Sequence, residues 1–166
     1  GIATKEYKKL VEKTGFEFMD ANNYEFASYK KTYPSDAILF EYDGLQKAYS
    51  IIDNTENEVG VVYCAKKTNI VIDNGYGDQK KNAIFFISFS TVNGDILGIK
   101  FADNNIPYVS NDFKTLVQGG IENYDFENDD IYTASPIITG ATYSSTGMQE
   151  AIKAVHDVFT SEYPSL

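Results

Sequence analysis

The sequence has few of the residues that build disulfides or Cys/His metal sites. Among its 166 residues there is one cysteine and one histidine, and tryptophan is absent. An intrachain disulfide is therefore excluded, and a zinc site of the usual kind lacks its ligands. We expect Cys64, in a Tyr- and Val-rich run, to be a buried apolar residue rather than a nucleophile. We expect His156 to be an ordinary helix residue.

Long apolar runs and an excess of positive charge are also missing. No run reaches the roughly 18 apolar residues that would indicate a transmembrane helix, so we expect no direct membrane span in this chain. The net charge of −10 repels the phosphate backbone of nucleic acids and anionic lipid headgroups. We therefore expect no nucleic-acid partner and no membrane binding through surface charge.

What remains is enough apolar sequence for one globular core. A chain of 166 residues with 43% hydrophobic residues is typical of a single domain, so we take residues 1–166 as one unit. The order of elements predicts an α+β fold: a single domain with a twisted, mainly antiparallel sheet and flanking helices. The expected helices are 4–19, 21–33, 112–118 and 147–161, and the expected strands are 37–42, 47–52, 58–65, 69–72, 83–92 and 95–101.

The clearest strand signal is a hairpin. Asn93-Gly94 lies between two β-rich runs, the strongest short-range hairpin pattern. Residues 83–87 are all apolar, and this continuous run predicts a central strand that is covered on both faces.

The clearest helix signal is near the C-terminus. Thr146 and Gln149 have the spacing of a capping box, which places the helix start near Gly147. Apolar residues then recur on one helical face, which we expect to pack on the sheet: Met148, Ile152, Val155 and Phe159.

The segment before this helix carries the candidate chemistry. Residues 139–147 combine Ser and Thr hydroxyls with small residues. Hydroxyls donate hydrogen bonds to phosphate oxygens. The free N–H groups and the dipole at a helix start favour an anion. From these residues alone, a phosphate cradle and an ordinary capped helix preceded by a polar loop both remain open.

Thr139-Gly140-Ala141-Thr142-Tyr143-Ser144-Ser145 resembles the Ser/Thr-Gly-Ala-Thr-x-Thr/Ser-Ser motif of the FMN-binding domain family. That family includes flavin-carrying components of the sodium-translocating NADH:quinone oxidoreductase and of the ion-translocating ferredoxin:NAD oxidoreductase. The similarity spans roughly residues 25–159 and includes Gly75-Tyr76-Gly77, the Asn93-Gly94 hairpin and Ile96-Leu97-Gly98-Ile99. In the family, the motif threonine carries FMN through a phosphodiester bond that a flavin transferase installs. Thr142 has that position here.

The resemblance implies an FMN-carrying electron-transfer domain, with no catalytic residue, no metal and no turnover of its own. Its implied partners are membrane redox subunits or other electron carriers, and a flavin transferase. Its implied location is extracytoplasmic, secreted or membrane-anchored, and the start at Gly1 rather than Met suggests a leader or anchor that precedes residues 1–20, an N-terminal helix. The implied cofactor-binding residues are Thr142, Thr139, Gly140, Ala141, Tyr143, Ser144, Ser145, Gly75, Tyr76 and Gly77.

Two segments differ from the family pattern. Pro136 stands where the family usually has Asp, and Asn105-Ile106-Pro107-Tyr108 stands where many members have Glu-Thr-Pro-Gly. The missing Asp bears on covalent attachment, since it belongs to the sequence that the transferase recognises. It therefore keeps open a second interpretation, a non-redox extracellular ligand-binding or surface module that retains the fold without covalent flavin. An FMN-dependent reductase with its own small substrate ranks third, because no acid/base pair is visible.

Overall fold

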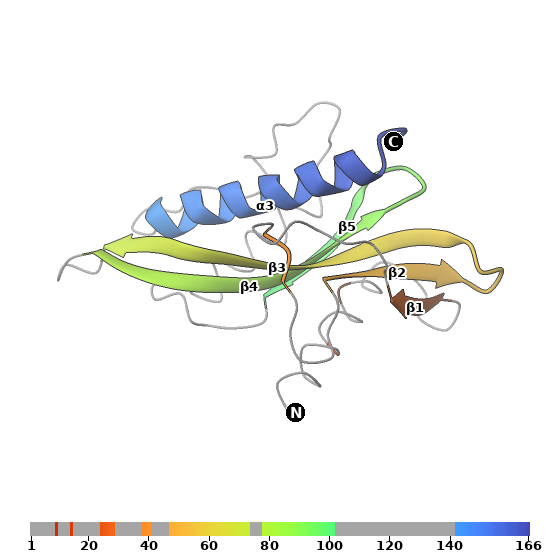
Figure 1. The fold of residues 1–166 in the computed structure, drawn as a ribbon, viewed down its shortest axis with the longest axis horizontal. Helices are drawn as coiled ribbons and strands as arrows, with labels where there is room; N and C mark the ends of the chain where they lie inside the picture. The colour runs from red at the N-terminus through yellow and green to blue at the C-terminus, as the bar shows by residue number, and fades with distance from the viewer. Residues whose placement is uncertain are drawn as a thin grey trace.

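The computed structural model describes residues 9, 14, 24–28, 38–40, 47–73, 78–101 and 142–166. Within these ranges, strands and a long helix form an α+β arrangement (Figure 1). The elements are β1 (Tyr24–Ser28), β2 (Ala48–Asp53), β3 (Glu58–Asp73), β4 (Asp78–Ser90), β5 (Ile96–Phe101) and α3 (Thr142–Glu162).

The sheet in the described part of the chain is antiparallel throughout. Its five strands follow the order β1-β2-β3-β4-β5, so each strand pairs with its neighbours along the sequence. Helix α3 packs along β3 and covers one face of the sheet (Figure 1). The predicted α+β class and mainly antiparallel sheet are thus seen in these residues. None of the described helices is long and apolar enough to cross a membrane.

Strands β3 and β4 are longer than the sequence pattern predicts. The two strands expected at 58–65 and 69–72 are one strand of 16 residues. Lys67 pairs with Ala83 and Ile70 pairs with Lys81, so β3 accommodates an extra residue through a local irregularity. Strand β4 begins at Asp78 rather than at residue 83. Its polar first residues give no apolar signal, but their backbone pairs with β3 all the same.

The helix predicted at 21–33 is wrong for the residues that the structure describes there. Tyr24–Ser28 is strand β1, which pairs antiparallel with β2 from Tyr24 opposite Asp53 to Ser28 opposite Tyr49. Tyr and Phe fit a pleated, half-buried surface. Pairing with β2 supplies hydrogen bonds from a distant segment, which a local pattern cannot reveal.

The strand predicted at 37–42 is reduced to a single bridge within residues 38–40. Leu39 pairs with Ala65, and the Phe40 N–H donates to the Cys64 carbonyl over 2.8 Å. The predicted strand 47–52 corresponds to β2 and the predicted strand 95–101 to β5. Lys9 and Thr14 are helical, as expected within 4–19. The rest of that helix, the helix at 112–118, the positions of 21–33 other than 24–28, and residues 37, 41 and 42 lie outside the described residues.

One side of the core lies between the sheet and α3. The predicted apolar face of the helix is buried at Ile152, Val155 and Phe159. The Phe159 ring stacks on Phe89, with centroids 4.4 Å apart and an angle of 9° between the planes. The Tyr63 ring meets both phenylalanines edge-on. Burial of this face is confirmed at these three residues, and their packing holds α3 on the sheet. The side chain of Met148, the fourth predicted residue of the face, lies outside the description.

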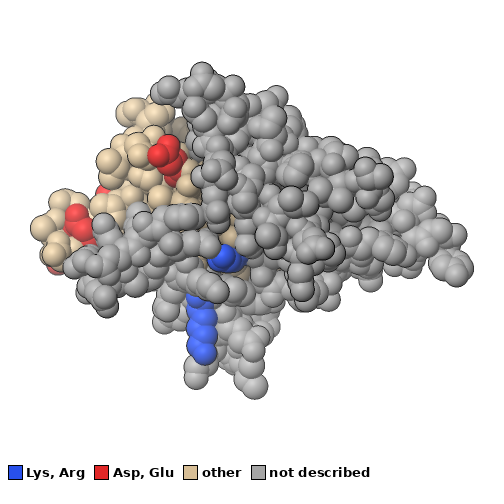
Figure 2. All heavy atoms as spheres, turned by 180° about the vertical axis from the view of Figure 1, so that it is seen from behind, with Lys and Arg blue, Asp and Glu red and all other residues tan. Residues whose placement is uncertain are grey.

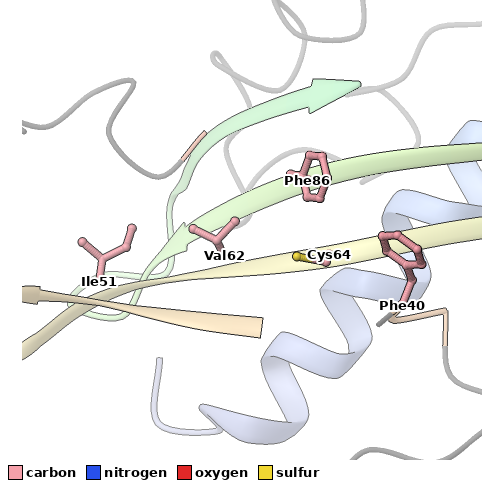
Figure 3. Close-up of a cluster of buried hydrophobic side chains, with 5 residues drawn as sticks. All are labelled: Phe40, Ile51, Val62, Cys64 and Phe86. Carbon is pink, nitrogen blue, oxygen red and sulfur yellow. The ribbon is translucent and has the colours of Figure 1, made fainter. Parts of the chain in front are cut away.

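The other side of the core lies on the opposite face of the sheet. Because side chains alternate along a strand, Val62 and Cys64 point away from the face that carries Tyr63. They form a buried cluster with residues of neighbouring segments (Figure 3), namely Phe40, Ile51 and Phe86. Burial raises the pKa of the Cys64 thiol, so this residue is a core residue, as expected, and not a thiolate nucleophile.

Strand β4 is covered on both faces, as its apolar run predicts. Phe85, Phe86 and Ile87 are consecutive and have no exposed surface. The next side chain, buried Ser88, donates from its hydroxyl to the carbonyl of Thr14 over 2.9 Å. Thr14 is itself buried, so an N-terminal residue packs against β4 here. The described strands therefore contact residues from both ends of the chain.

Candidate cofactor site at the start of α3

Helix α3 begins earlier than its capping pattern predicts. Its first residue is Thr142, not a residue near Gly147. The expected cap, Thr146, therefore lies inside the helix, and the helix continues through Gly147. The cost of an interior glycine, about 1 kcal/mol, is offset by packing of the apolar face on the sheet. The threonine of the FMN motif becomes the first residue of the helix.

The first turn of α3 suits an anion. The leading N–H groups of any α-helix have no acceptor within the helix, and here they belong to residues 142–145. The chain has 24 Asp and Glu residues, yet the first turn of α3 contains none. Acidic side chains commonly stabilise that position by neutralising the helix dipole. In α3 the first turn supplies no such charge, which leaves the positive end of the dipole for an external group such as a phosphate.

Three contacts show how α3 runs along β3. The Tyr163 hydroxyl, just after the last residue of α3, donates to Glu58 Oε1 over 2.7 Å at the start of β3. Phe159 contacts Tyr63 further along the strand. Lys67 Nζ then lies 3.9 Å from Glu150 Oε2. Residue numbers fall along the helix as they rise along the strand, so the two elements are antiparallel.

This direction fixes the end of the sheet at which α3 starts. From Glu150 back to Thr142 the helix extends by about 12 Å at 1.5 Å per residue, or between three and four residues of a strand. The start of α3 therefore lies toward the end of the hairpin where Asp73 pairs with Asp78. Figure 1 shows the pale-blue start of α3 over that end of β3 and β4. Thr142, the first residue of α3, therefore lies at the same end of the sheet as Asp73 and Asp78, the strand residues that flank the segment 74–77.

The structure places four of the predicted cofactor residues. Thr142, Tyr143, Ser144 and Ser145 are the first residues of α3. Six lie outside the described residues: Thr139, Gly140, Ala141, Gly75, Tyr76 and Gly77. The described backbone thus brings together the borders of the two predicted segments, the start of α3 and the ends of β3 and β4.

Glu58 is a positioning residue that no sequence pattern singles out. Its carboxylate accepts hydrogen bonds from the hydroxyls of Ser50 and Tyr163. It links β2 to the C-terminal end of α3 and so helps to set the helix on the sheet. Glu58 and Tyr163 are 105 positions apart, and no local pattern connects residues at that separation.

His156, the single histidine, lies in a packed environment on the helix. His156 is half-buried on α3, with its ring centroid 6.1 Å from that of Phe89. Burial is the main cause that lowers the pKa of His156. The charge of Lys153 lowers this pKa further, and the charge of Asp157 partly opposes the shift. Within the described ranges, no three His, Cys, Asp or Glu side chains are grouped to hold a metal ion.

Several acidic residues whose side chains the structure describes lie away from the start of α3. They belong to the turns at the opposite end of the sheet and to the end of α3, namely Asp53, Glu56, Asp95 and Glu162. Among the residues that Figure 2 shows in colour, the acidic side chains lie toward the left of the view from behind. Within α3 itself, the first turn contains no acidic residue, whereas the last residue of the helix is Glu162.

Comparison of the chain with family models, with curated proteins and with solved structures found no match. The resemblance to the FMN-binding domain family therefore rests on the motif residues and their spacing. The geometry at the start of α3 is an independent observation, because it does not depend on that resemblance.

Proposed function

We propose that this chain is an FMN-carrying electron-transfer domain of an extracytoplasmic or membrane-associated redox system, with the FMN phosphate at Thr142. The observation that carries the proposal is the position of Thr142 as the first residue of α3. There the free N–H groups and the helix dipole favour a phosphate. The resemblance of residues 139–145 to a flavin-attachment motif supplies the identity of the cofactor.

The donor set at the start of α3 fits a phosphate better than it fits a metal. Backbone N–H groups donate to anionic oxygens, and hydroxyls add donors without adding charge. FMN, when bound, supplies one- and two-electron transfer, while the protein binds and orients it. A helix dipole contributes about 0.3–1 kcal/mol, which is small in a chain of net charge −10. Ring burial or a covalent bond at Thr142 must therefore supply most of the retention.

The proposed domain is a single unit in which helices flank both faces of a twisted sheet. Helix α3 provides the cover on one face. The hydrogen bond between the Ser88 hydroxyl and the Thr14 carbonyl supports an N-terminal helix on the other. Gly75-Tyr76-Gly77 and Thr139-Gly140-Ala141 would border the cofactor, with redox subunits or other carriers as electron partners.

Intact-protein mass spectrometry after co-expression with a flavin transferase tests the attachment. We expect an added mass of one FMN minus one water, and we expect it to disappear in Thr142→Ala. Thr146→Ala is the matched control, because it removes a threonine hydroxyl from the same helix about one turn later. This variant should keep the added mass. Loss of the added mass in both variants, or in neither, would contradict attachment at Thr142.

A second candidate function is a non-redox ligand-binding or surface module that has kept the fold without covalent flavin. Pro136, in place of the Asp that the transferase recognises in the family, favours it. The visible spectrum of the purified protein after incubation with free FMN separates the two functions. No added mass and no bound flavin would remove the FMN proposal and leave this module.

Pro136→Asp refines the same comparison. If position 136 belongs to the transferase recognition sequence, the substitution should raise the flavinylated fraction in the co-expression experiment. A variant that binds free FMN but gains no covalent flavin would restrict the proposal to reversible binding.

A further inference from the structure

We draw no further inference here: the strongest candidate, the exposed apolar side chains of Val92 and Leu166 beside the turn between β4 and β5, carries nothing because the structure does not show what covers them.

Discussion

The turn between β2 and β3 and the turn between β4 and β5 require the same unusual backbone shape but achieve it with different residues. Glu56 has a φ of 63° in the first turn, and Gly94 has a φ of 84° in the second. Both angles lie in the left-handed region, which glycine adopts without steric cost and other L-residues adopt at a cost. The first turn must therefore compensate for strain that the second avoids.

The turn between β2 and β3 is stabilised by its own side chains. Asp53 Oδ1 accepts hydrogen bonds from the Thr55 N–H at 2.8 Å, the Thr55 hydroxyl at 2.7 Å and the Asn57 N–H at 3.0 Å. All three hydrogen bonds are exposed to solvent. The Asp53 carboxylate, together with the backbone hydrogen bond that the Glu56 N–H donates to the Asp53 carbonyl, thus organises the loop.

The turn between β4 and β5 is stabilised partly by the helix. The Ser90 hydroxyl accepts from the N–H groups of Val92 and Asn93. A Cβ built on Gly94 would lie 3.7 Å from Leu166 Cβ and 4.0 Å from Phe159 Cε1. The turn with a left-handed L-residue thus depends on a strong local acceptor, whereas the turn at Gly94 combines glycine with a neighbouring side chain of α3, Phe159, although Val92 and Asn93 in that turn are exposed.

The largest loss of stability is expected when the aromatic contact between α3 and the sheet is removed. Phe159→Ala deletes the ring that stacks on Phe89 and lies beside Gly94, and we expect a loss of about 3–5 kcal/mol of unfolding free energy. Urea denaturation measures it. The control is Thr160→Ala, an exposed neighbour whose loss should stay within about 0.5 kcal/mol. Equal, small losses in both variants would show that α3 does not pack on this face.

Gly94→Ala should cause the next largest loss of unfolding free energy. The new Cβ makes only ordinary contacts, so the cost is conformational, about 1–2 kcal/mol for a left-handed L-residue. Glu56→Ala is the matched control, because it exchanges one non-glycine residue for another at the left-handed position of the other turn. The comparison fails if thermal or urea melts show the same loss for both substitutions.

Asp53→Ala and Ser90→Ala should differ in their pH dependence. Hydrogen bonds, chiefly from the Thr55 side chain, lower the pKa of Asp53 below its ordinary value of 3.8. Its contribution is therefore fully present above pH 3.8 and is lost as the pH falls through the lowered folded-state pKa. Stability measured across that range should show the deficit of Asp53→Ala shrinking in acid.

The deficit of Ser90→Ala should stay constant over the same range, because a serine hydroxyl does not titrate there. Parallel behaviour of the two variants would mean that the Asp53 charge does not stabilise its turn.

Glu56→Gly should have the smallest effect, and it should be stabilising. Relief of left-handed strain is worth about 1–2 kcal/mol, and the greater freedom of glycine in the unfolded chain offsets about 0.5–1 kcal/mol of it. The midpoint of a urea melt should therefore rise slightly. A lower midpoint would show that Asp53 and its partners have already removed the strain.

The parts of the fold that the sequence predicts are those that depend on local pattern. Asn93-Gly94 marks its turn because glycine is needed there, and the apolar face of α3 repeats with the helical period. The long β3 and β4 and the short β1 were mispredicted because pairing between strands satisfies backbone groups whatever the side chains are. The turn at Glu56 shows the same limit, because its left-handed residue is not a glycine.

For the candidate site, the sequence predicts which residues take part but not where the helix that carries them begins. The motif predicts Thr142 as the attachment residue, but the capping pattern misplaces the helix start, since α3 begins at Thr142 and a local capping preference is weak enough for the tertiary context to override. The anchoring of α3 by Glu58 joins segments that no periodicity relates. The residues of the proposed site therefore come from the sequence motif and stay a prediction, whereas the position of the helix that carries Thr142 is known only from the sheet on which it packs.

The antiparallel docking of α3 on β3 also sets an order of events during synthesis. Glu58 meets a partner 105 positions later in the chain, so the strands leave the ribosome well before their helical cover exists. Closing so long a loop is slow compared with forming the adjacent hairpins. We expect the strand pairs to form first and the helix to dock last. If the proposed attachment of FMN at Thr142 is right, the flavin transferase would act only after α3 has been synthesised and has docked on the sheet.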